Sequence, residues 1–380
     1  MNNFEAPVDG KKLRVAFTHD IFAAQAYGGI SRYFVGLVKA LNDIDDFKAK
    51  IFAPLYRNVY AAQLPKSMLY GYKIPDLRRS QRVVNAIDES ISRFPLCSYR
   101  PNIIHETYYS QRPTWARNAI RVTTVYDMIH EIYPDQLGDA KYLTPLKKKA
   151  IDRCDYIFCI SRKTQEDLVD IMGVDPKKTV VTHLGFDALK RSDTDDVNKD
   201  ACREKPYLLF VGRRSGYKNF EKFLRAFSYS PVLRATFNIV CFGGGKIAAD
   251  ERLLMTELGL REGEVTQQDG DDVALAGAYR HAAAFVYPSL YEGFGIPPLE
   301  AMSFGCPVLC SNTSSIPEVV GDAGDYFDPT NTESIRSCLE NLAAHNSWRD
   351  TLIRRGYERC KMFSWERCAM VTAETYRKIA

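Results

Sequence analysis

Short apolar runs rich in β-branched residues alternate with helix-length segments along almost the whole chain. Ten runs have the length and composition of strands: 13–20, 48–55, 102–109, 121–128, 156–161, 179–186, 207–214, 237–244, 283–289 and 307–312. Because these runs are apolar nearly throughout, they are typical of parallel strands that helices cover on both faces. The pattern therefore predicts an α/β fold built from doubly wound parallel sheets.

One polar segment interrupts this alternation. Residues 189–206 lack periodicity and end in proline, which indicates a linker between two compact halves. We predict a Rossmann-like domain over 1–188, a second one over 207–362, and a final helix over 363–380.

A further helical pattern covers residues 76–94, where apolar positions recur at helical spacing beside several arginines. Two interpretations stay open. The segment is either a surface helix packed on its domain or a basic amphipathic face that meets a membrane or a lipid-linked acceptor.

Charge and composition narrow the classes of function. The 380 residues include 51 basic and 47 acidic ones, a balance that does not by itself indicate nucleic-acid binding. No apolar run approaches the roughly 20 residues of a membrane-spanning helix, and the N-terminus lacks the apolar region of a secretory signal. Ten scattered cysteines without a CxxC predict reduced thiols in a cytoplasmic protein.

The histidines and acidic residues do not predict a metal site. The six histidines do not fall at metal-ligand spacings, and the DxD tripeptides fall at a predicted helix end, in the linker and in a turn. The glycine run at 242–246 follows a strand; it is either a loop that approaches a phosphate or a flexible turn.

Doubly wound sheets bind ligands beyond the carboxyl ends of their strands, and unusual loops follow several predicted strands. Gly28 and Gly29 come soon after the first strand, with Arg32 in the next helix. They predict either a tight turn or a close backbone approach to a ligand. In the second half a strand leads into Arg213, Arg214 and then Lys218, a set of cations suited to a diphosphate.

The stretch after the ninth strand, "YEGFGIPPLEAM", carries two glutamates eight residues apart. Glu292 lies in a glycine-rich loop. Pro298 suits the first position of a helix, which would place Glu300 in the first turn. The pair is either a catalytic acid/base couple or two parts of one binding site.

Another candidate group follows the third and fourth strands. Asp127 and His130 lie where the fourth strand ends, and His105 lies near the end of the third. Each histidine is either a satisfied core residue or a group for acid/base or hydrogen-bonding work.

Six segments in order resemble the retaining glycosyltransferases of family 4: "GGISRY", "CISRKTQEDL", "VVTHLGFD", "FVGRRSGYKNF", residues 288–329 and "FSWERCA". The "GYKNF" wording resembles a subset of that family. The resemblance implies the GT-B fold, in which two Rossmann-like domains face an interdomain cleft. It also implies that the final helix, starting near Trp365, crosses back to the N-terminal domain.

The resemblance implies roles for the candidate residues. Glu300 would hold the ribose hydroxyls of a nucleotide-sugar, and Glu292 would face the transferred sugar. Lys218 with Arg213 or Arg214 would bind the diphosphate, and Arg214 is preferred. The backbone from 293 to 299 and the N-terminal glycine pair would also contact the donor; this set comprises Gly28, Gly29, Gly293, Phe294, Gly295, Ile296, Pro298 and Leu299.

The chain departs from the family pattern at the end of the fourth strand. Many members carry a histidine there, whereas this chain has Tyr126 followed by Asp127, with His130 three residues further on. Asp127 is the first choice for contacting sugar or acceptor. The weaker acceptor-side candidates are Arg32, His105, Tyr126 and His130.

The resemblance implies a retaining hexosyltransferase that needs neither metal nor cofactor. GDP-mannose is the favoured donor, with UDP-hexoses and dTDP-rhamnose as alternatives. The acceptor would be a glycan or lipid-linked saccharide of a surface polysaccharide, reached by peripheral contact with the inner membrane face. Alternatives are a nucleotide-sugar epimerase of the same fold and a non-catalytic nucleotide-sugar-binding protein.

Overall fold

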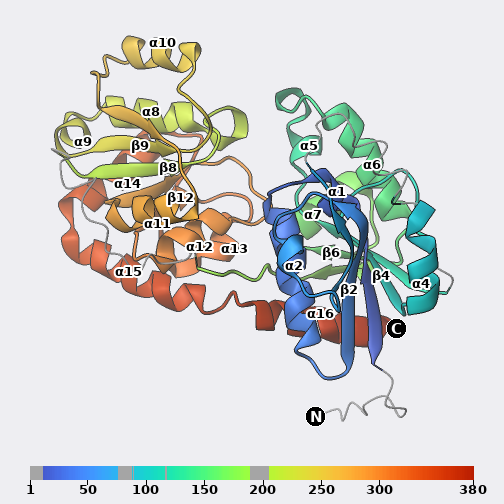
Figure 1. Ribbon diagram of the computed structural model, residues 1–380. Helices are drawn as coiled ribbons and strands as arrows, with labels where there is room; N and C mark the ends of the chain where they lie inside the picture. Colours follow the sequence, from blue (N-terminus) through green and yellow to red (C-terminus); the bar gives the residue numbers. More distant parts are fainter. Residues whose placement is uncertain (1–11, 76–87, 89, 116–117, 189–204) are drawn as a thin grey trace. The chain divides into compact units, whose positions relative to one another are not determined.

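The computed structural model describes residues 12–75, 88, 90–115, 118–188 and 205–380. They form two compact units (Figure 1). The first unit runs to Gly185 and also includes Ser364–Ala380, and the second comprises Phe186–Phe363. Most of the predicted helix over 76–94 and of the predicted linker over 189–206 lies outside the described residues.

The first unit is built on a seven-stranded parallel sheet of order β3-β2-β1-β4-β5-β6-β7. Its strands are β1 (Leu13–Phe17), β2 (Phe47–Tyr56), β3 (Leu69–Lys73), β4 (Ile103–Glu106), β5 (Ile120–Val125), β6 (Tyr156–Cys159) and β7 (Thr179–Val181). Its α-helices are α1 (Asp20–Ala24), α2 (Gly29–Asn42), α4 (Arg93–Tyr99), α5 (Ile129–Ile132), α6 (Ala140–Asp152), α7 (Arg162–Met172) and α16 (Trp365–Ile379).

Strand β4 shows why the strands of this sheet are apolar throughout. Successive side chains of a strand point to opposite faces. Ile104 packs with Leu96 of α4 on one face, whereas His105 contacts Phe34 of α2 and Tyr376 of α16 on the other. Both faces are therefore buried under helices, as the sequence pattern predicted.

The C-terminal helix α16 packs against α2 of the first unit (Figure 1). Glycine makes this contact possible, because a Cβ at Gly36 would lie 2.6 Å from the Trp365 ring and one at Gly185 would lie 2.4 Å from it. The last helix of the chain thus belongs to the first unit.

The second unit contains a six-stranded parallel sheet of order β10-β9-β8-β11-β12-β13. Its strands are β8 (Tyr207–Val211), β9 (Asn238–Phe242), β10 (Val265–Gln268), β11 (Ala284–Tyr287), β12 (Val308–Ser311) and β13 (Gly324–Phe327). Its α-helices are α8 (Phe220–Ser228), α9 (Pro231–Thr236), α10 (Ala249–Glu257), α11 (Asp272–His281), α12 (Ile296–Ser303), α13 (Ile316–Val320), α14 (Thr332–Ala344) and α15 (Asn346–Cys360).

Short 3₁₀ helices occur in both units. They lie at Ala61–Gln63, Pro134–Gln136 and Pro176–Lys178 in the first unit, and at Gly216–Lys218 and Gly321–Ala323 in the second.

A continuous core covers one face of this second sheet. Phe210 of β8 packs there with Phe223 of α8 and Leu339 of α14. On the opposite face Phe285 of β11 meets the ring of Tyr279 from α11 at 5.5 Å.

The predicted doubly wound α/β fold is confirmed, and each of the ten predicted strands is present; most are shorter than predicted, whereas β2 extends one residue beyond its predicted bounds at each end. Three strands were missed: β3, β10 and β13, all at the edge of a sheet. Among the described residues, no helix combines the length and the apolar character that crossing a bilayer requires.

Candidate functional site

The candidate site of the second unit lies where the strand order of its sheet reverses. From the central strand β8 the chain adds β9 and β10 on one side, and β11, β12 and β13 on the other. The loops after β8 and β11 therefore leave the carboxyl edge of the sheet side by side. This switch point is where open α/β sheets bind ligands.

Lys218 and Glu292, predicted from these two loops, form an ion pair. Lys218 Nζ lies 2.6 Å from Glu292 Oε1, and the two side chains are 20% and 10% exposed. The ammonium also lies 5.3 Å from the ring centre of Tyr217 and 5.8 Å from that of Tyr287. The pair is thus held between aromatic rings and remains partly open to solvent.

Tyr287 is a partner of Glu292 that sequence reasoning missed. Burial, with the charge of Glu292 and a hydrogen bond to it, holds the pKa of Tyr287 well above its ordinary value. The phenol therefore stays protonated and donates to the carboxylate. Its position as the last residue of β11 was the available signal.

Asn219 ties the two loops together. Its backbone is left-handed, with φ of 59°, and its side-chain amide donates to the carbonyls of Pro288 (3.0 Å) and Pro329 (2.8 Å). Leu290 N donates to Tyr217 O at 2.8 Å. These bonds hold the loop after β8, which carries Lys218, against the loop after β11, which carries Glu292.

Two serines after β12 fix the backbone around Glu292. Ser314 Oγ donates to Glu292 O at 2.7 Å. Ser315 Oγ lies 2.8 Å from both Glu292 O and Phe294 O. Both serines lie in segment 288–329, which resembles the family 4 glycosyltransferases, but the sequence alone did not predict a role for them.

Helix α12 begins earlier than the sequence predicted. It starts at Ile296, after Gly295 in a left-handed conformation with φ of 116°, so Pro297 and Pro298 occupy its second and third positions. Proline is tolerated there because the first N–H groups of a helix have no intrahelical acceptor. The prediction that Pro298 opens the helix with Glu300 in its first turn is therefore wrong; Glu300 lies in the second turn.

Glu300 has its own partner, Tyr279, which the sequence analysis did not single out. The phenol oxygen lies 3.2 Å from Glu300 Oε2, and both residues are buried. Burial and the neighbouring glutamate hold the pKa of Tyr279 well above its ordinary value, so this phenol also donates. Separate tyrosines for the two glutamates fit two parts of a binding site better than one acid/base couple.

The two neighbouring arginines differ sharply. Arg214 is buried, and its guanidinium donates to Glu251 Oε1 (2.7 Å), Gly243 O (3.1 Å) and Gly245 O (2.9 Å). Arg213 is exposed. The predicted preference for Arg214 on a diphosphate is therefore corrected: its donors face protein groups, and Arg213 is the better candidate.

In the first unit, the glycine pair caps a helix. Gly28 is the N-cap of α2, and its carbonyl accepts from Ser31 Oγ and Arg32 N. A Cβ at Gly29 would meet nothing within 4 Å, so the backbone is open there. The Arg32 guanidinium lies over the Tyr60 ring at 5.4 Å.

Two of the weaker acceptor-side candidates prove to be core residues. His105 is fully buried, with Nδ1 2.6 Å from Tyr376 OH and Nε2 2.7 Å from Thr124 Oγ1. Burial lowers its pKa to about 3. Tyr126 is buried and donates to Thr107 O at 2.7 Å. Both predictions of an acceptor-side role are wrong, because these side chains are buried and hydrogen-bonded to other residues of the first unit.

Asp127 and His130 do lie together and are partly exposed. His130 Nδ1 is 4.0 Å from Asp127 Oδ1, and its Nε2 is 3.4 Å from Asp139 Oδ1, a partner that the sequence did not reveal. Lys147 Nζ donates a hydrogen bond to Asp127 O at 2.9 Å and so holds the backbone of this turn.

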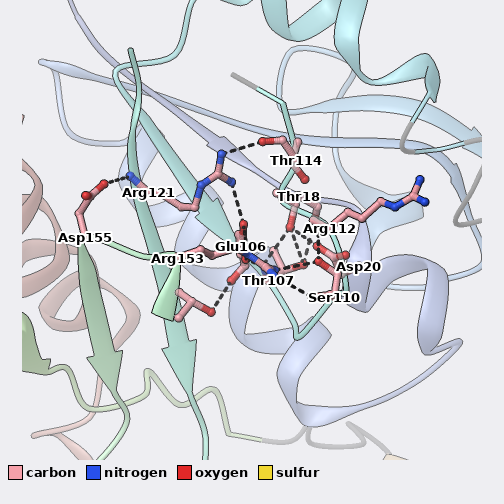
Figure 2. Close-up of polar contacts among 11 residues, drawn as sticks. Thr18, Asp20, Glu106, Thr107, Ser110, Arg112, Thr114, Arg121, Arg153 and Asp155 are labelled. Carbon is pink, nitrogen blue, oxygen red and sulfur yellow. Dashed lines mark hydrogen bonds and ion pairs between the residues drawn. The ribbon is translucent and has the colours of Figure 1, made fainter. Parts of the chain in front are cut away.

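A buried carboxylate holds the loop that follows β4 (Figure 2). Glu106 receives Arg121 Nη1 at 2.7 Å and Arg153 Nε at 2.9 Å. The same arginines donate to the carbonyls of Thr114 and Ser110 at 2.8 Å. This network fastens residues 107–115 to the sheet. Among the described residues no group of three potential ligand side chains is placed to hold a metal.

Comparison with known proteins agrees with this geometry. The family described as "Glycosyl transferases group 1" matches residues 192–359, and "Glycosyltransferase Family 4" matches residues 27–188. O-antigen chain mannosyltransferase B of Escherichia coli is 29% identical over 92% of this chain and 96% of its own.

Solved structures share the fold over nearly the whole chain. Sucrose-phosphate synthase from Thermosynechococcus elongatus has a TM-score of 0.74 at 20% identity, covering 97% of this chain and 99% of that one. Alr3699/HepE from Anabaena, solved in complex with UDP-glucose, has a TM-score of 0.68 at 15% identity, covering 96% of this chain and 100% of that one. One glycosyltransferase family model thus matches each of the two Rossmann-like units, and the chain has the GT-B fold and is similar to glycosyltransferases of family 4.

Proposed function

We propose that this glycosyltransferase moves mannose from GDP-mannose to a glycan or lipid-linked saccharide of a surface polysaccharide, with retention of anomeric configuration. The observation that carries the proposal is the Lys218–Glu292 pair at the switch point of the second sheet. The choice of mannose is supported by the similarity to O-antigen mannosyltransferase B. UDP-hexoses and dTDP-rhamnose remain the alternative donors.

The diphosphate of the donor would lie near Lys218, Arg213 and the start of α12. The cations neutralise phosphate charge. Pro297 and Pro298 have no N–H, so the N–H groups of Gly295 and Ile296 are the ones at this helix start that favour an anion. Glu300 would accept hydrogen bonds from ribose hydroxyls while Tyr279 holds its other side. Glu292 would face the sugar. The loop backbone between them would line the donor through Gly293, Phe294, Gly295, Ile296, Pro298 and Leu299.

Departure of the nucleoside diphosphate is the difficult step. Negative charge grows on the phosphate oxygen as the bond to the anomeric carbon breaks, and a preorganised cation stabilises it. Lys218, held near Glu292 before the donor arrives, supplies such charge without a metal or a cofactor. One such donor contributes about 3 kcal/mol to the transition state.

Retention would follow from attack on the same face. The acceptor hydroxyl approaches beside the departing phosphate, passes its proton to the phosphate oxygen, and forms the new bond to the anomeric carbon. Asp127 and His130 of the first unit are candidates for contacting the sugar or the acceptor, because they are partly exposed. If the acceptor is lipid-linked, the protein would contact the membrane face that carries this acceptor.

A donor panel followed by a transfer assay tests the proposal. GDP-mannose should raise the melting temperature more than other nucleotide-sugars, because a ligand that binds only the folded state stabilises it. Mannose should then appear on a polysaccharide acceptor in the α configuration of the donor, read from NMR couplings. An inverted product, or an epimerised sugar formed from donor alone, would contradict it.

A further inference from the structure

The glycine run after β9 is pinned in place. Gly243, Gly244 and Gly245 all have left-handed φ angles, between 71° and 79°. Arg214 holds this loop by donating to two of its carbonyls and to that of Lys246, and its side chain is only 2% exposed. Glu251 in turn holds the guanidinium. Three carbonyls of residues 243–246 are therefore held by one buried guanidinium.

Peptide geometry then determines where the amides of this loop point. In a trans peptide the C=O of one residue and the N–H of the next point in opposite directions, and the described chain contains no cis bond. Because the carbonyls of 243, 245 and 246 turn toward Arg214, the N–H groups of Gly244, Lys246 and Ile247 turn away from it. Gly244 and Lys246 are exposed and Ile247 is partly buried, so we take the first two amides as the donors that a ligand could reach.

An open pocket of about 920 Å³ lies beside this loop, and its lining has five basic residues against three acidic ones. The basic lining residues besides Arg214 are Arg213, Lys222, Arg225 and Lys246. Of the three acidic lining residues, Glu251 pairs with Arg214 and Glu221 with Arg225, which leaves only Asp250 against the remaining cations. Lys218 and Glu292 do not line this pocket.

We propose that this pocket binds a phosphate group at a second site, which does not include Lys218 or Glu292 and shares only Arg213 with the proposed donor site. The outward amides and the Lys246 ammonium bind the phosphate oxygens, because backbone N–H groups and a cation together favour an anion. Arg214 and Glu251 act as positioning residues that present the amides. The inference goes beyond the proposed transfer reaction and does not depend on which sugar is moved.

Titration of inorganic phosphate, followed by calorimetry, tests the site. The Lys218→Ala variant, in which the first cation is removed, should still bind phosphate. Adding Lys246→Glu in that background should weaken binding at least tenfold, whereas Arg354→Glu, a charge reversal at another exposed position of the same unit, should not change it. Phosphate binding that disappears with Lys218→Ala alone, or that survives Lys246→Glu, would overturn the proposal.

Glu251→Gln tests the positioning role. It leaves every lining cation in place but removes the charge that balances the buried Arg214 guanidinium, so phosphate affinity should fall severalfold at a temperature where circular dichroism shows the variant folded, and the melting temperature should also fall. Unchanged affinity would show that the clamp does not present the amides.

Competition identifies the source of the phosphate. If GDP displaces the bound phosphate from Lys218→Ala, the group belongs to a nucleotide; if it does not, the phosphate belongs to another ligand, such as a lipid-linked diphosphate acceptor. Wild-type mannosyl transfer is measured on the same preparation. Loss of the phosphate site alone leaves the proposed function standing, and absent transfer with an intact phosphate site refutes only the proposed function.

Discussion

Each unit holds a carboxylate against cations near the end of a strand, and the two arrangements differ in how completely they are satisfied. Glu106 in the first unit is 1% exposed and receives both Arg121 and Arg153, each 15% exposed. Glu292 in the second unit is 10% exposed, and its partner Lys218 is 20% exposed. Both pairs have short contacts, so distance alone does not separate them.

The difference lies in what remains available to a ligand. Both Glu106 oxygens are taken by guanidinium groups that also donate to loop carbonyls (Figure 2), so the network fastens the fold. Burial raises the pKa of Glu106, and the arginines oppose that shift. Lys218 is a single ammonium at a sheet switch point, lies between two aromatic rings and is partly exposed. An open pair of this kind can exchange its partner for a phosphate.

Glu106→Ala should give the largest effect, on stability. Removing one partner of a buried ion pair typically costs about 3–5 kcal/mol, because the remaining charges are left uncompensated. Urea unfolding should show a loss of that size, while the matched change Glu358→Ala at an exposed pair should cost under about 1 kcal/mol. Equal losses of unfolding free energy in the two variants would contradict the claim that the Glu106 network stabilises the fold more than an exposed ion pair does.

Lys218→Ala should give the next largest effect, on activity. Losing one transition-state donor should lower kcat/KM about a hundredfold or more, since it supplies about 3 kcal/mol. Circular dichroism and the melting temperature should change little, because the pair is partly exposed. A stable Lys218→Ala enzyme with wild-type turnover would show that the open pair is structural as well.

His105 extends the contrast to pH. Its folded pKa of about 3 lies below the roughly 6.5 of an unfolded histidine, so below that value the unfolded chain binds more protons. Its contribution to the free energy of unfolding should thus fall as pH drops from about 6.5, by up to ~1.4 kcal/mol per pH unit.

Urea melts of wild type and His105→Gln at pH 7 and pH 5 measure this slope. The variant should lose less stability on acidification than the wild type. His281→Gln, at an exposed histidine, should follow the wild type. A wild-type slope in His105→Gln would contradict the buried, neutral assignment.

Tyr279→Phe should give the smallest effect. It removes the hydrogen bond to Glu300 without removing the ring, and one such bond contributes about 1 kcal/mol. Donor affinity should weaken severalfold in a titration, with kcat nearly unchanged. A loss as large as that of a Glu300 variant would mean that Tyr279 contacts the donor itself.

Much of the fold could be predicted from the sequence because a strand that is buried on both faces needs apolar residues at nearly every position. The three missed strands lack that signal. β10 (VTQQ) is only partly buried along its length, β3 (LYGYK) turns most of its residues to solvent, and β13 (GDYF) is buried at its two ends only. Each has a neighbour on one side only, so its sequence need not be apolar throughout.

The site was predicted where loops carry charge that a turn does not need. Lys218 and Glu292 stood out for that reason, and the structure joins them. The hydroxyl partners of the glutamates, such as Tyr279 of Glu300 and Ser315 of Glu292, could not be identified because tyrosine and serine are ordinary in strands, helices and turns. The choice between adjacent arginines failed because sequence does not show which one points toward Glu251.

A titration of nucleotide-sugar into wild type and Glu300→Ala tests the central claim most directly. The claim is that the second unit holds the donor between Lys218, Glu292 and Glu300. For the nucleotide-sugar that stabilises the wild type most, Glu300→Ala should bind at least tenfold more weakly, and Arg354→Glu should bind as the wild type does. Wild-type affinity in Glu300→Ala would contradict the account.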